Sequence, residues 1–249
     1  MKILIWLVSI AAIGLGAAIA VSGPGSQMGL WGFSDGLSLI RTLAFPVMIA
    51  TGVAAIAFVV SLFVARGAAP LALIAVIAGG TASMVPVKLN EAFQSNPPIH
   101  DITTDFENPP MIVAGANAER RNPPEYLGDA SVMNSDLTVT EAQQQAFPDI
   151  APHLYGESVE SVAETVRGIL GDMGMEIIGE QQIENGLLIE ATYTSFWYGF
   201  VDDFVVRISA DNAMTRVDVR SKSRIGTSDL GANAARIRAF LERLDKAVD

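Results

Sequence analysis

The hydrophobic residues form long uninterrupted runs before residue 90 and short periodic patterns after it. Three runs, at residues 3–21, 43–65 and 67–87, contain no charged residue. A helix needs about 20 apolar residues to cross the hydrocarbon core of a bilayer. The pattern therefore predicts three transmembrane helices within residues 1–88.

The short connections between these runs suggest an orientation. Lys2 precedes the first run and Arg66 separates the second from the third, so both lie on one side if all three helices span. The positive-inside rule makes that side cytoplasmic, although Arg41 and Lys88 then lie outside. We expect an integral protein of the cytoplasmic (inner) membrane with its N-terminus inside and residues 90–249 on the periplasmic side.

The first run has a second interpretation. Ala18-Ile19-Ala20 resembles a signal-peptidase site, so this segment could be cleaved. A run of 19 apolar residues is long for a signal peptide, which favours a retained helix. With either interpretation, the hairpin of the second and third helices keeps the following residues outside the cytoplasm.

Residues 89–152 are rich in proline. Pro-Pro pairs begin at Pro97, Pro109 and Pro123. Consecutive prolines favour polyproline II and block helix. We expect an extended Pro-rich arm that lies over the domain, with one short helix over residues 140–146, capped at its first residue.

A compact core is predicted over residues 153–249. Apolar residues recur at helical spacing from Val159 to Met173, and again from about Leu230 to Ala247. Strand-like segments lie between them, at 175–179, 187–197, 203–209 and 215–225. Short connections between strands imply an antiparallel sheet. The predicted fold is a membrane-anchored α+β protein, with about four antiparallel strands packed against two amphipathic helices.

Charge separates the same two regions. The chain has 16 Lys and Arg and 27 Asp and Glu, but only Asp35 is an acid before residue 90, and four basic residues flank the runs. The exported part therefore holds 12 basic and 26 acidic residues, a formal charge of −14. Phosphate backbones repel such a domain, so no nucleic-acid partner is expected. The chain has no Cys, which excludes disulfides, thiol nucleophiles and Cys-based zinc sites.

Alternating charges on the last predicted strand form a first candidate site. Arg216, Asp218, Arg220, Lys222 and Arg224 share one face of this strand, and we call them the cationic rail. One interpretation is a solvated face on which Asp218 bridges its neighbours. The other is a binding surface for an anionic ligand.

A second candidate precedes the last helix. Ser228 and Asp229 can cap its free backbone N–H groups, which is worth about 0.5–2 kcal/mol. Alternatively, those groups could bind an anion, although the Asp229 carboxylate competes for them. Asn233 and Arg236, one turn further on, could face the cationic rail.

The segment NPPIHDITTDFENPP contains a third set of candidates. His100, Asp101 and Asp105 could bind a metal ion, or His100 could act as a general base for a serine. With only two histidines in the chain, a His-rich metal site is excluded, and no G-x-S-x-G motif is present. Local hydrogen bonds that hold this segment to the core are the more ordinary interpretation. No metal or cofactor is predicted.

The segment SFWYGFVDD brings aromatic and acidic residues together at a turn between strands. Trp197 and its aromatic neighbours could form a ligand box but are more often part of a core. Asp202 and Asp203 would point to opposite faces of a strand, so they make a poor acid–base pair. Arg207 and Arg220 are candidates to balance their charge.

Three segments resemble a known family. PPIHDITTDFENPP, EATYTSFWYGFVDDFVVRIS and RVDVRSKSRIGTSDLGANAARIRAFLERL are similar, in this order, to the bacterial and plastid family called domain of unknown function 1499. The resemblance covers residues 95–246 and implies no reaction, substrate or catalytic residue. The following residues fall in the family's recurring motifs: His100, Asp101, Asp105, Asp202, Asp203, Arg207, Arg220, Arg224, Ser228, Asp229 and Asn233. The C-terminal elements also resemble lipid-binding helix-grip domains, at the level of fold alone.

Three functions remain as hypotheses. The favoured one is a non-catalytic exported domain that binds a small anionic or lipid-like ligand or an envelope protein, through the motif residues just named and Trp197. The second is an envelope hydrolase that uses His100 with Asp101 or Asp105. The third is a scaffold that acts through the membrane helices, where small residues between Gly14 and Ala18 permit close approach.

Overall fold

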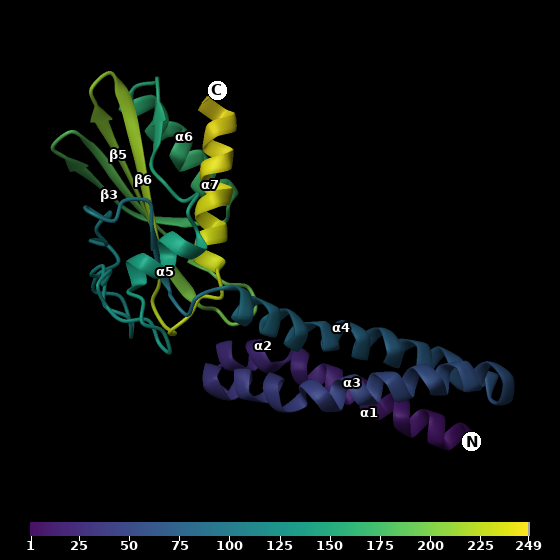
Figure 1. Cartoon of the computed structure of the whole chain (residues 1–249). Helices are drawn as coiled ribbons and strands as arrows, with labels where there is room; N and C mark the ends of the chain where they lie inside the picture. The colour runs from purple at the N-terminus through teal and green to yellow at the C-terminus, as the bar shows by residue number, and fades with distance from the viewer. Residues whose placement is uncertain (249) are drawn as a thin grey trace. The chain divides into compact units, whose positions relative to one another are not determined.

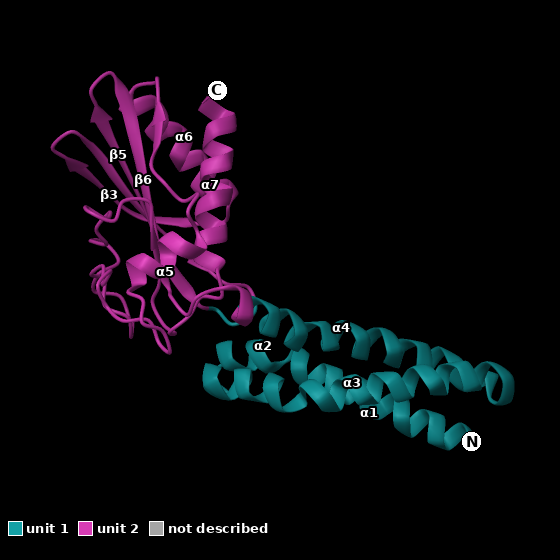
Figure 2. Ribbon diagram, in the orientation of Figure 1, with its two compact units in different colours: residues 1–92, 197–199 teal, residues 93–196, 200–249 magenta. Residues whose placement is uncertain are grey.

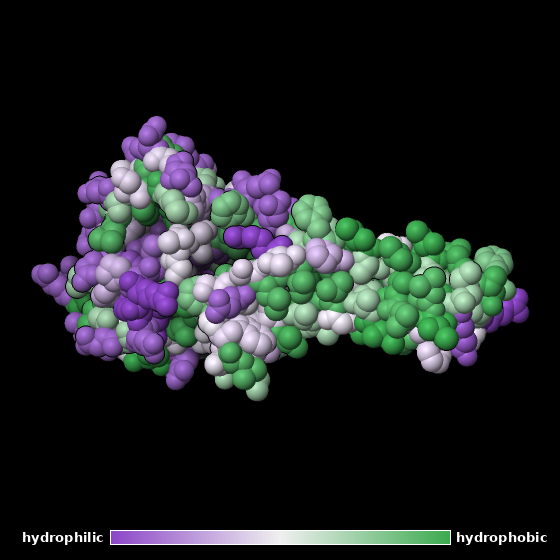
Figure 3. Space-filling view, turned by 90° about the horizontal axis from the view of Figure 1, so that it is seen from below, coloured by the Kyte–Doolittle hydropathy of each residue, from purple (hydrophilic) through white to green (hydrophobic). Residues whose placement is uncertain are grey.

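The computed structural model describes residues 1–248, and the chain forms two compact units (Figures 1 and 2). Unit 1 comprises residues 1–92 and 197–199, and unit 2 comprises residues 93–196 and the chain from residue 200 onward. Figure 3 shows mainly hydrophobic residues on the visible surface of the helical unit and mainly hydrophilic residues on that of the sheet domain.

Unit 1 consists of helices. They are α1 (Lys2–Ala20), α2 (Ser22–Gln27), α3 (Phe33–Val64), the 3-10 turn η1 (Arg66–Ala68) and α4 (Ala69–Ser95), whose last residues belong to unit 2. Three helical stretches are long and apolar enough to cross a membrane, as predicted. Small residues allow close packing between them: a Cβ added at Gly16 of α1 would lie 3.2 Å from the Ala78 carbonyl oxygen of α4.

Two of these helices extend beyond the apolar runs that predicted them. α3 begins at Phe33, before the charged residues Asp35 and Arg41, and α4 continues to Ser95. Hydropathy marks the part of a helix that suits hydrocarbon, whereas backbone hydrogen bonds continue into polar surroundings. Pro46 and Pro86 therefore lie inside helices, where packed neighbours make a proline tolerable.

Unit 2 is built on one antiparallel sheet of six strands, with order β1-β6-β5-β4-β3 and β2 also paired to β6. The strands are β1 (Asp101–Thr103), β2 (His153–Tyr155), β3 (Glu176–Ile183), β4 (Gly186–Thr194), β5 (Val201–Asp211) and β6 (Met214–Ser223). The predicted number of about four is too small. β1 and β2 have three residues each, too few to show alternation, and they form because β6 offers them an edge.

Helices cover one face of the sheet. α6 (Val159–Asp172) and α7 (Ala232–Val248) lie side by side on it (Figure 1). Their apolar residues, including Val166, Ile237 and Phe240, join residues of β4, β5 and β6 in one buried core. α7 begins later than predicted because Leu230 and Gly231 have φ angles of 56° and 83°, a left-handed turn that a helix cannot contain.

The Pro-rich stretch is mostly irregular, with one helix, α5 (Val139–Ala146). Thr138 rather than Thr140 caps this helix: its hydroxyl accepts the Glu141 N–H, while the Glu141 carboxylate accepts the Thr138 N–H. This reciprocal pair is a capping box. The boundary drawn at residue 152 between arm and core stays a prediction.

Candidate functional site

The cationic rail lies beneath the Pro-rich stretch. Asp218, Arg220 and Lys222 are 0%, 2% and 1% exposed. The predicted alternation is confirmed, since Val217 and Val219 enter the core on the helix side of β6. The interpretation as a solvated face is wrong, because backbone and side chains of residues 101–126 cover the charges and bind them.

Asp101 pairs with both cations at the centre of the rail. It lies opposite Lys222 in the β1–β6 ladder, and its carboxylate accepts from Nε and Nη2 of Arg220, both at 2.9 Å. Lys222 Nζ lies 2.9 Å from the same carboxylate and donates to the Glu125 carbonyl. Burial lowers the pKa of Lys222, although Asp101 acts in the opposite direction.

Arg220 also holds in place residues 101–126, which we call the covering segment. Its Nη1 donates to the Pro110 carbonyl and its Nη2 to the Pro124 carbonyl, at 3.2 and 3.0 Å. The Tyr126 ring lies over its guanidinium at 5.5 Å. Carbonyl groups in two of the three Pro-Pro pairs thus accept hydrogen bonds from one arginine.

A second charged group lies near the start of β6. Asp218 accepts from Arg207 and Arg216 at 2.8 and 2.9 Å, as the bridging role predicted for it requires. Asp105 accepts from the same two guanidinium groups at 2.8 and 3.2 Å. Burial alone would raise the pKa of Asp105, but hydrogen bonds from the Asn108 N–H and from Arg207 outweigh it and lower that pKa.

A third charged group lies at the other end of β6. Asp203 Oδ1 accepts from Nε and Nη2 of Arg224 at 2.9 and 2.7 Å, and Asp203 Oδ2 lies 3.0 Å from Nη1 of Arg120. Arg120, only 7% exposed, also donates to the carbonyls of Asn122 and Gly115. Its Nη2 atom and the neighbouring Asp203 Oδ2 atom are both buried and have no hydrogen-bond partner within residues 1–248.

Glu190 of β4 completes this end of the site. Its carboxylate accepts the backbone N–H groups of Val113, Ala114 and Gly115 at 2.9, 2.8 and 3.2 Å. A Cβ added at Gly115 would lie 2.7 Å from Asp203 Oδ1, so a larger residue there would force the Asp203 carboxylate or the segment to shift. We call the following seven residues, of which Arg120 and Arg224 are partly buried and the others buried, the charge cluster: Asp101, Arg120, Glu190, Asp203, Arg220, Lys222 and Arg224.

A separate polar layer joins α7 to the other face of β6. Ser221 Oγ donates to Asn233 Oδ1 at 2.6 Å, and Asn233 Nδ2 donates to Ser223 Oγ at 3.0 Å and to the His100 carbonyl. Arg236 donates to Ser221 at 3.1 Å. Asn233 and Arg236 therefore do not face the cationic rail, because α7 packs on the opposite side of the strand.

Asp202 and Asp203 point to opposite faces of β5, as predicted. Asp202 accepts from Arg236 Nη2 at 2.8 Å, and that guanidinium lies 4.2 Å from the centre of the Tyr193 ring. The prediction that Arg207 and Arg220 balance the charges of these two acids is wrong. The ladder places Arg207 opposite Asp218 and Arg220 opposite Val205, so both are out of register with the two acids.

Asp229 caps the approach to α7, as the capping interpretation requires. Its carboxylate accepts the N–H groups of Gly231 and Asn233 at 2.8 and 2.9 Å, and Ser228 Oγ accepts the Leu230 N–H at 3.2 Å. Burial raises the pKa of Asp229, although these hydrogen bonds act in the opposite direction. The N–H groups considered for an anion therefore already have a carboxylate as their acceptor.

The acidic residues that a hydrolase would pair with His100 have other partners. Burial, then the charge of Lys222, lowers the pKa of His100. The Asp101 carboxylate is used by Arg220 and Lys222, and Asp105 is held by arginines near the start of β6. Within the described chain, no group of three or more His, Asp or Glu side chains is placed to hold a metal ion.

Trp197 lies in unit 1 and not in the core of the sheet domain, where its aromatic segment was expected. Its Nε1 donates to the carbonyl of Ala20, the last residue of α1, at 3.1 Å. Gln27 Nε2 donates to the Trp197 carbonyl, and the Tyr198 hydroxyl donates to Ser22 Oγ. The β4–β5 connection thus supplies residues 197–199 to the helical unit.

Sequence reasoning missed Arg120 and Glu190. Arg120 lies in an irregular segment, where no periodicity indicates which side chains turn inward. Glu190 could have been found, because it is the single acid in the apolar strand GLLIEATYT and lies at an alternating position that must be buried if both faces are covered.

The sheet domain matches a known protein family. The family described as "Protein of unknown function (DUF1499)" matches residues 101–244, more than half of the chain. The match runs from β1 into α7 and so contains the whole sheet and the charge cluster. Neither a curated protein nor a solved structure matches the chain.

Proposed function

We propose that this chain, which belongs to the DUF1499 family of proteins of unknown function, is a membrane-anchored, non-catalytic protein that binds a small anion in its sheet domain. The site is the charge cluster beneath residues 113–126. The ligand is an oxyanion such as phosphate, sulfate or a small carboxylate. One observation carries the proposal: Nη2 of Arg120 is buried and has no hydrogen-bond partner among residues 1–248.

A buried guanidinium N–H without an acceptor is costly. Leaving a buried donor unsatisfied costs about 1–3 kcal/mol, and more when the group is charged. Native proteins satisfy nearly all such groups with protein, water or ions. An oxyanion beside Arg120 would supply the acceptor, and guanidinium groups match carboxylate and phosphate geometry.

The net charge of the charge cluster also favours the binding of an anion. Arg120, Arg220, Lys222 and Arg224 supply four positive charges, against three carboxylates from Asp101, Asp203 and Glu190. Buried charges are tolerated when they are paired, so one net positive charge favours an added anion. This excess occurs in an exported part whose formal charge is −14.

The covering segment governs access to the cluster. The N–H groups of Arg121 and Asn122 donate to the Arg224 carbonyl, and Asn122 Nδ2 donates to the carbonyls of Ser223 and Gly226. These bonds must open before an anion can enter or leave. We therefore expect slow exchange of the ligand.

We also propose that the protein lies in the cytoplasmic membrane, with its N-terminus inside and its sheet domain outside. Lys2 and Arg66 support this orientation through the positive-inside rule. The chain lacks Cys, so single cysteines at Gly67 and Asn212 can be tested with a membrane-impermeant maleimide in intact cells. Labelling at position 212 alone is expected, and labelling at position 67 alone would reverse the orientation.

Anion binding can be tested on the full chain in detergent by thermal unfolding at constant ionic strength. Sodium phosphate, sulfate and acetate replace chloride in turn. A ligand at about 100 times its Kd stabilises the folded state by about 2.7 kcal/mol. We expect at least one of these anions to stabilise the wild type and not the Arg120→Gln variant.

Arg167→Gln is the matched control. Arg167 pairs with Glu180 but is 32% exposed and lies outside the cluster. This variant should keep the full response to the anion. The proposal is wrong if none of the three anions stabilises the wild type, or if Arg120→Gln responds as the wild type does.

A further inference from the structure

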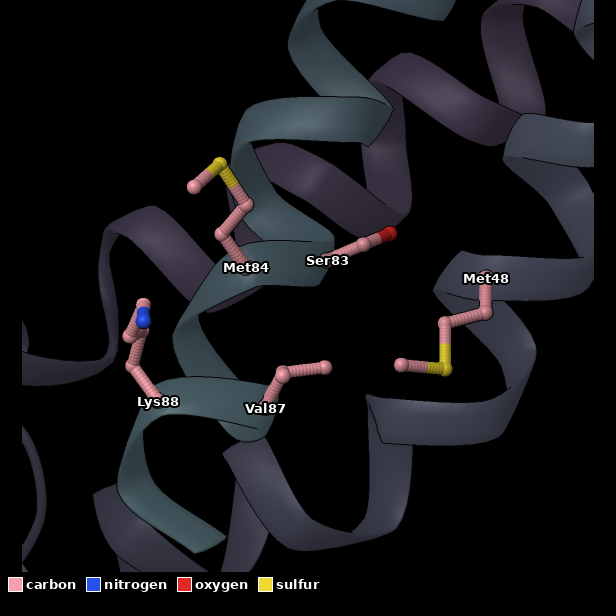
Figure 4. Close-up of a pocket in the computed structure, with 5 residues that line it drawn as sticks. All are labelled: Met48, Ser83, Met84, Val87 and Lys88. Carbon is pink, nitrogen blue, oxygen red and sulfur yellow. The ribbon is translucent and has the colours of Figure 1, made fainter. Parts of the chain in front are cut away.

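Two apolar grooves flank α4 and share Met84 and Lys88. The first, of about 200 Å³, is lined by Met48 of α3 and by Ser83, Met84, Val87 and Lys88 of α4. In Figure 4 the Met48 and Val87 side chains point toward one another across it. The second, of about 320 Å³, is lined by Met84, Val85, Lys88, Leu89 and Trp197. Lys88 is the one charged residue that lines either groove.

The length of α4 sets the depth of Lys88. Arg66 and Lys88 bound an apolar stretch and lie 22 residues apart. At 1.5 Å per residue this distance is about 33 Å, close to the thickness of about 30 Å of a hydrocarbon core. When this helix crosses a bilayer, the Lys88 ammonium therefore lies at the level of the lipid phosphates.

Trp197 independently indicates that this part of α4 lies at the membrane interface. Its indole N–H donates to Ala20, at the end of a different candidate span. Tryptophan concentrates at membrane interfaces because its ring is apolar and its N–H is polar. The second groove therefore has an apolar floor from α4, an interfacial aromatic wall and a cation.

Lys88 retains the capacity to bind an anion. Its Nζ contacts the Glu91 carboxylate at 2.9 Å, but the two side chains are 69% and 57% exposed. Exposed pairs of this kind contribute little, and an ammonium group has three donors. A lipid phosphate can therefore bind beside Glu91 or replace it.

We infer that this part of α4 is a binding site for one anionic phospholipid. Its phosphate contacts Lys88, and its acyl chains lie in the two grooves. The strongly acidic exported part is repelled by an anionic membrane surface, so a cationic site at the interface offsets that repulsion locally. This lipid site is separate from the charge cluster, and neither proposal depends on the other.

Quenching of Trp197 by brominated lipid tests the site in the full chain. The chain has three tryptophans, and Trp6→Phe with Trp31→Phe leaves Trp197 alone. This protein is reconstituted in phosphatidylcholine with rising fractions of brominated phosphatidylglycerol or brominated phosphatidylcholine. One interfacial cation contributes about 1 kcal/mol, so half-maximal quenching should need about five-fold less of the anionic lipid.

Three variants identify the residue responsible. Lys88→Gln should remove the preference, and Glu91→Gln should keep or strengthen it. Arg41→Gln, a basic residue of α3 outside both grooves, should leave it unchanged. Native mass spectrometry of the chain with all its tryptophans, with and without Lys88→Gln, repeats the test by counting bound lipids. Equal quenching by the two lipids, or a preference that survives Lys88→Gln, would overturn the inference.

Discussion

The two faces of β6 are covered by different kinds of structure and held by different forces. On one face Val217 and Val219 meet the regular helices α6 and α7 in an apolar core. On the other, Asp218 accepts from the Thr104 hydroxyl, and Arg220 and Lys222 donate to backbone carbonyls of the irregular segment.

The difference explains how an irregular segment can be held in one place. Apolar packing is not directional, so it suits helices that satisfy their own backbone groups. The Pro-rich stretch has many backbone groups that no regular structure satisfies, and buried polar groups need partners. Arg220, Lys222 and Glu190 supply those partners, so the charged face of β6 acts as a template for the segment.

Asp101→Asn should have the largest effect on the charged face. It leaves Arg220 and Lys222 buried without their carboxylate, and breaking a buried pair in this way costs about 3–5 kcal/mol. Denaturant unfolding of the full chain measures the loss. Hydrogen exchange should rise first in residues 104–130, while α6 and α7 remain protected.

Asp149→Asn is the control for this substitution. Asp149 pairs with Arg238, but the two side chains are 55% and 42% exposed, so the expected loss is about 0–1 kcal/mol. Uniform loss of protection over both faces in Asp101→Asn would show that they form a single cooperative unit.

Asn233→Ala should have a smaller effect, on the helix side. It leaves Ser221, Ser223 and Arg236 without one partner each, and unsatisfied buried polar groups cost about 1–3 kcal/mol. The apolar core around α7 stays intact, so exchange should rise near residues 221–236 and not in the Pro-rich stretch. A loss that equals that of Asp101→Asn would contradict the distinction between the two faces.

The smallest effects are opposite pH dependences on the two sides of β6. The lowered pKa of Asp105 contributes stability above its ordinary pKa of 3.8, and this contribution is lost as pH falls below 3.8. The raised pKa of Asp229 has the opposite effect. It contributes stability below pH 3.8, and this contribution is lost as pH rises from 3.8 through the folded-state pKa.

Unfolding of Asp105→Asn and Asp229→Asn over a pH series separates these contributions. The first variant should lose less stability than the wild type on acidification below 3.8. The second should lose less than the wild type as pH rises above 3.8. Changes of the same sign in both variants would show that the two carboxyl groups have similar surroundings.

Much of the fold could be predicted because its signals are local. Uncharged runs of spanning length indicate membrane helices wherever they occur. The periodicity of α6 and α7 and the alternation on β4, β5 and β6 depend only on neighbours in sequence. Even the opposite directions of Asp202 and Asp203 follow from the pleat of one strand.

Most of the candidate site could not be predicted from local sequence patterns. The residues of the cationic rail were identified, but whether water, a ligand or the chain covers them depends on where the Pro-rich stretch passes. Arg120 joins Asp203 across a long separation in sequence, and no pattern near either residue indicates it. The hydrolase hypothesis lacks support for the same reason, since tertiary contacts give Asp101 and Asp105 arginine and lysine partners.

The sequence by itself determined which segments suit a membrane, which form helices and strands, and which faces of β6 carry charge. Only the tertiary structure decided that the charges are buried, that Arg120 enters the cluster and that Trp197 joins the helical unit. The physical reason is the distance along the chain over which each effect acts. Hydropathy and backbone preference act over a few residues, whereas the partner of a buried charge is chosen by whichever distant segment the fold brings against it.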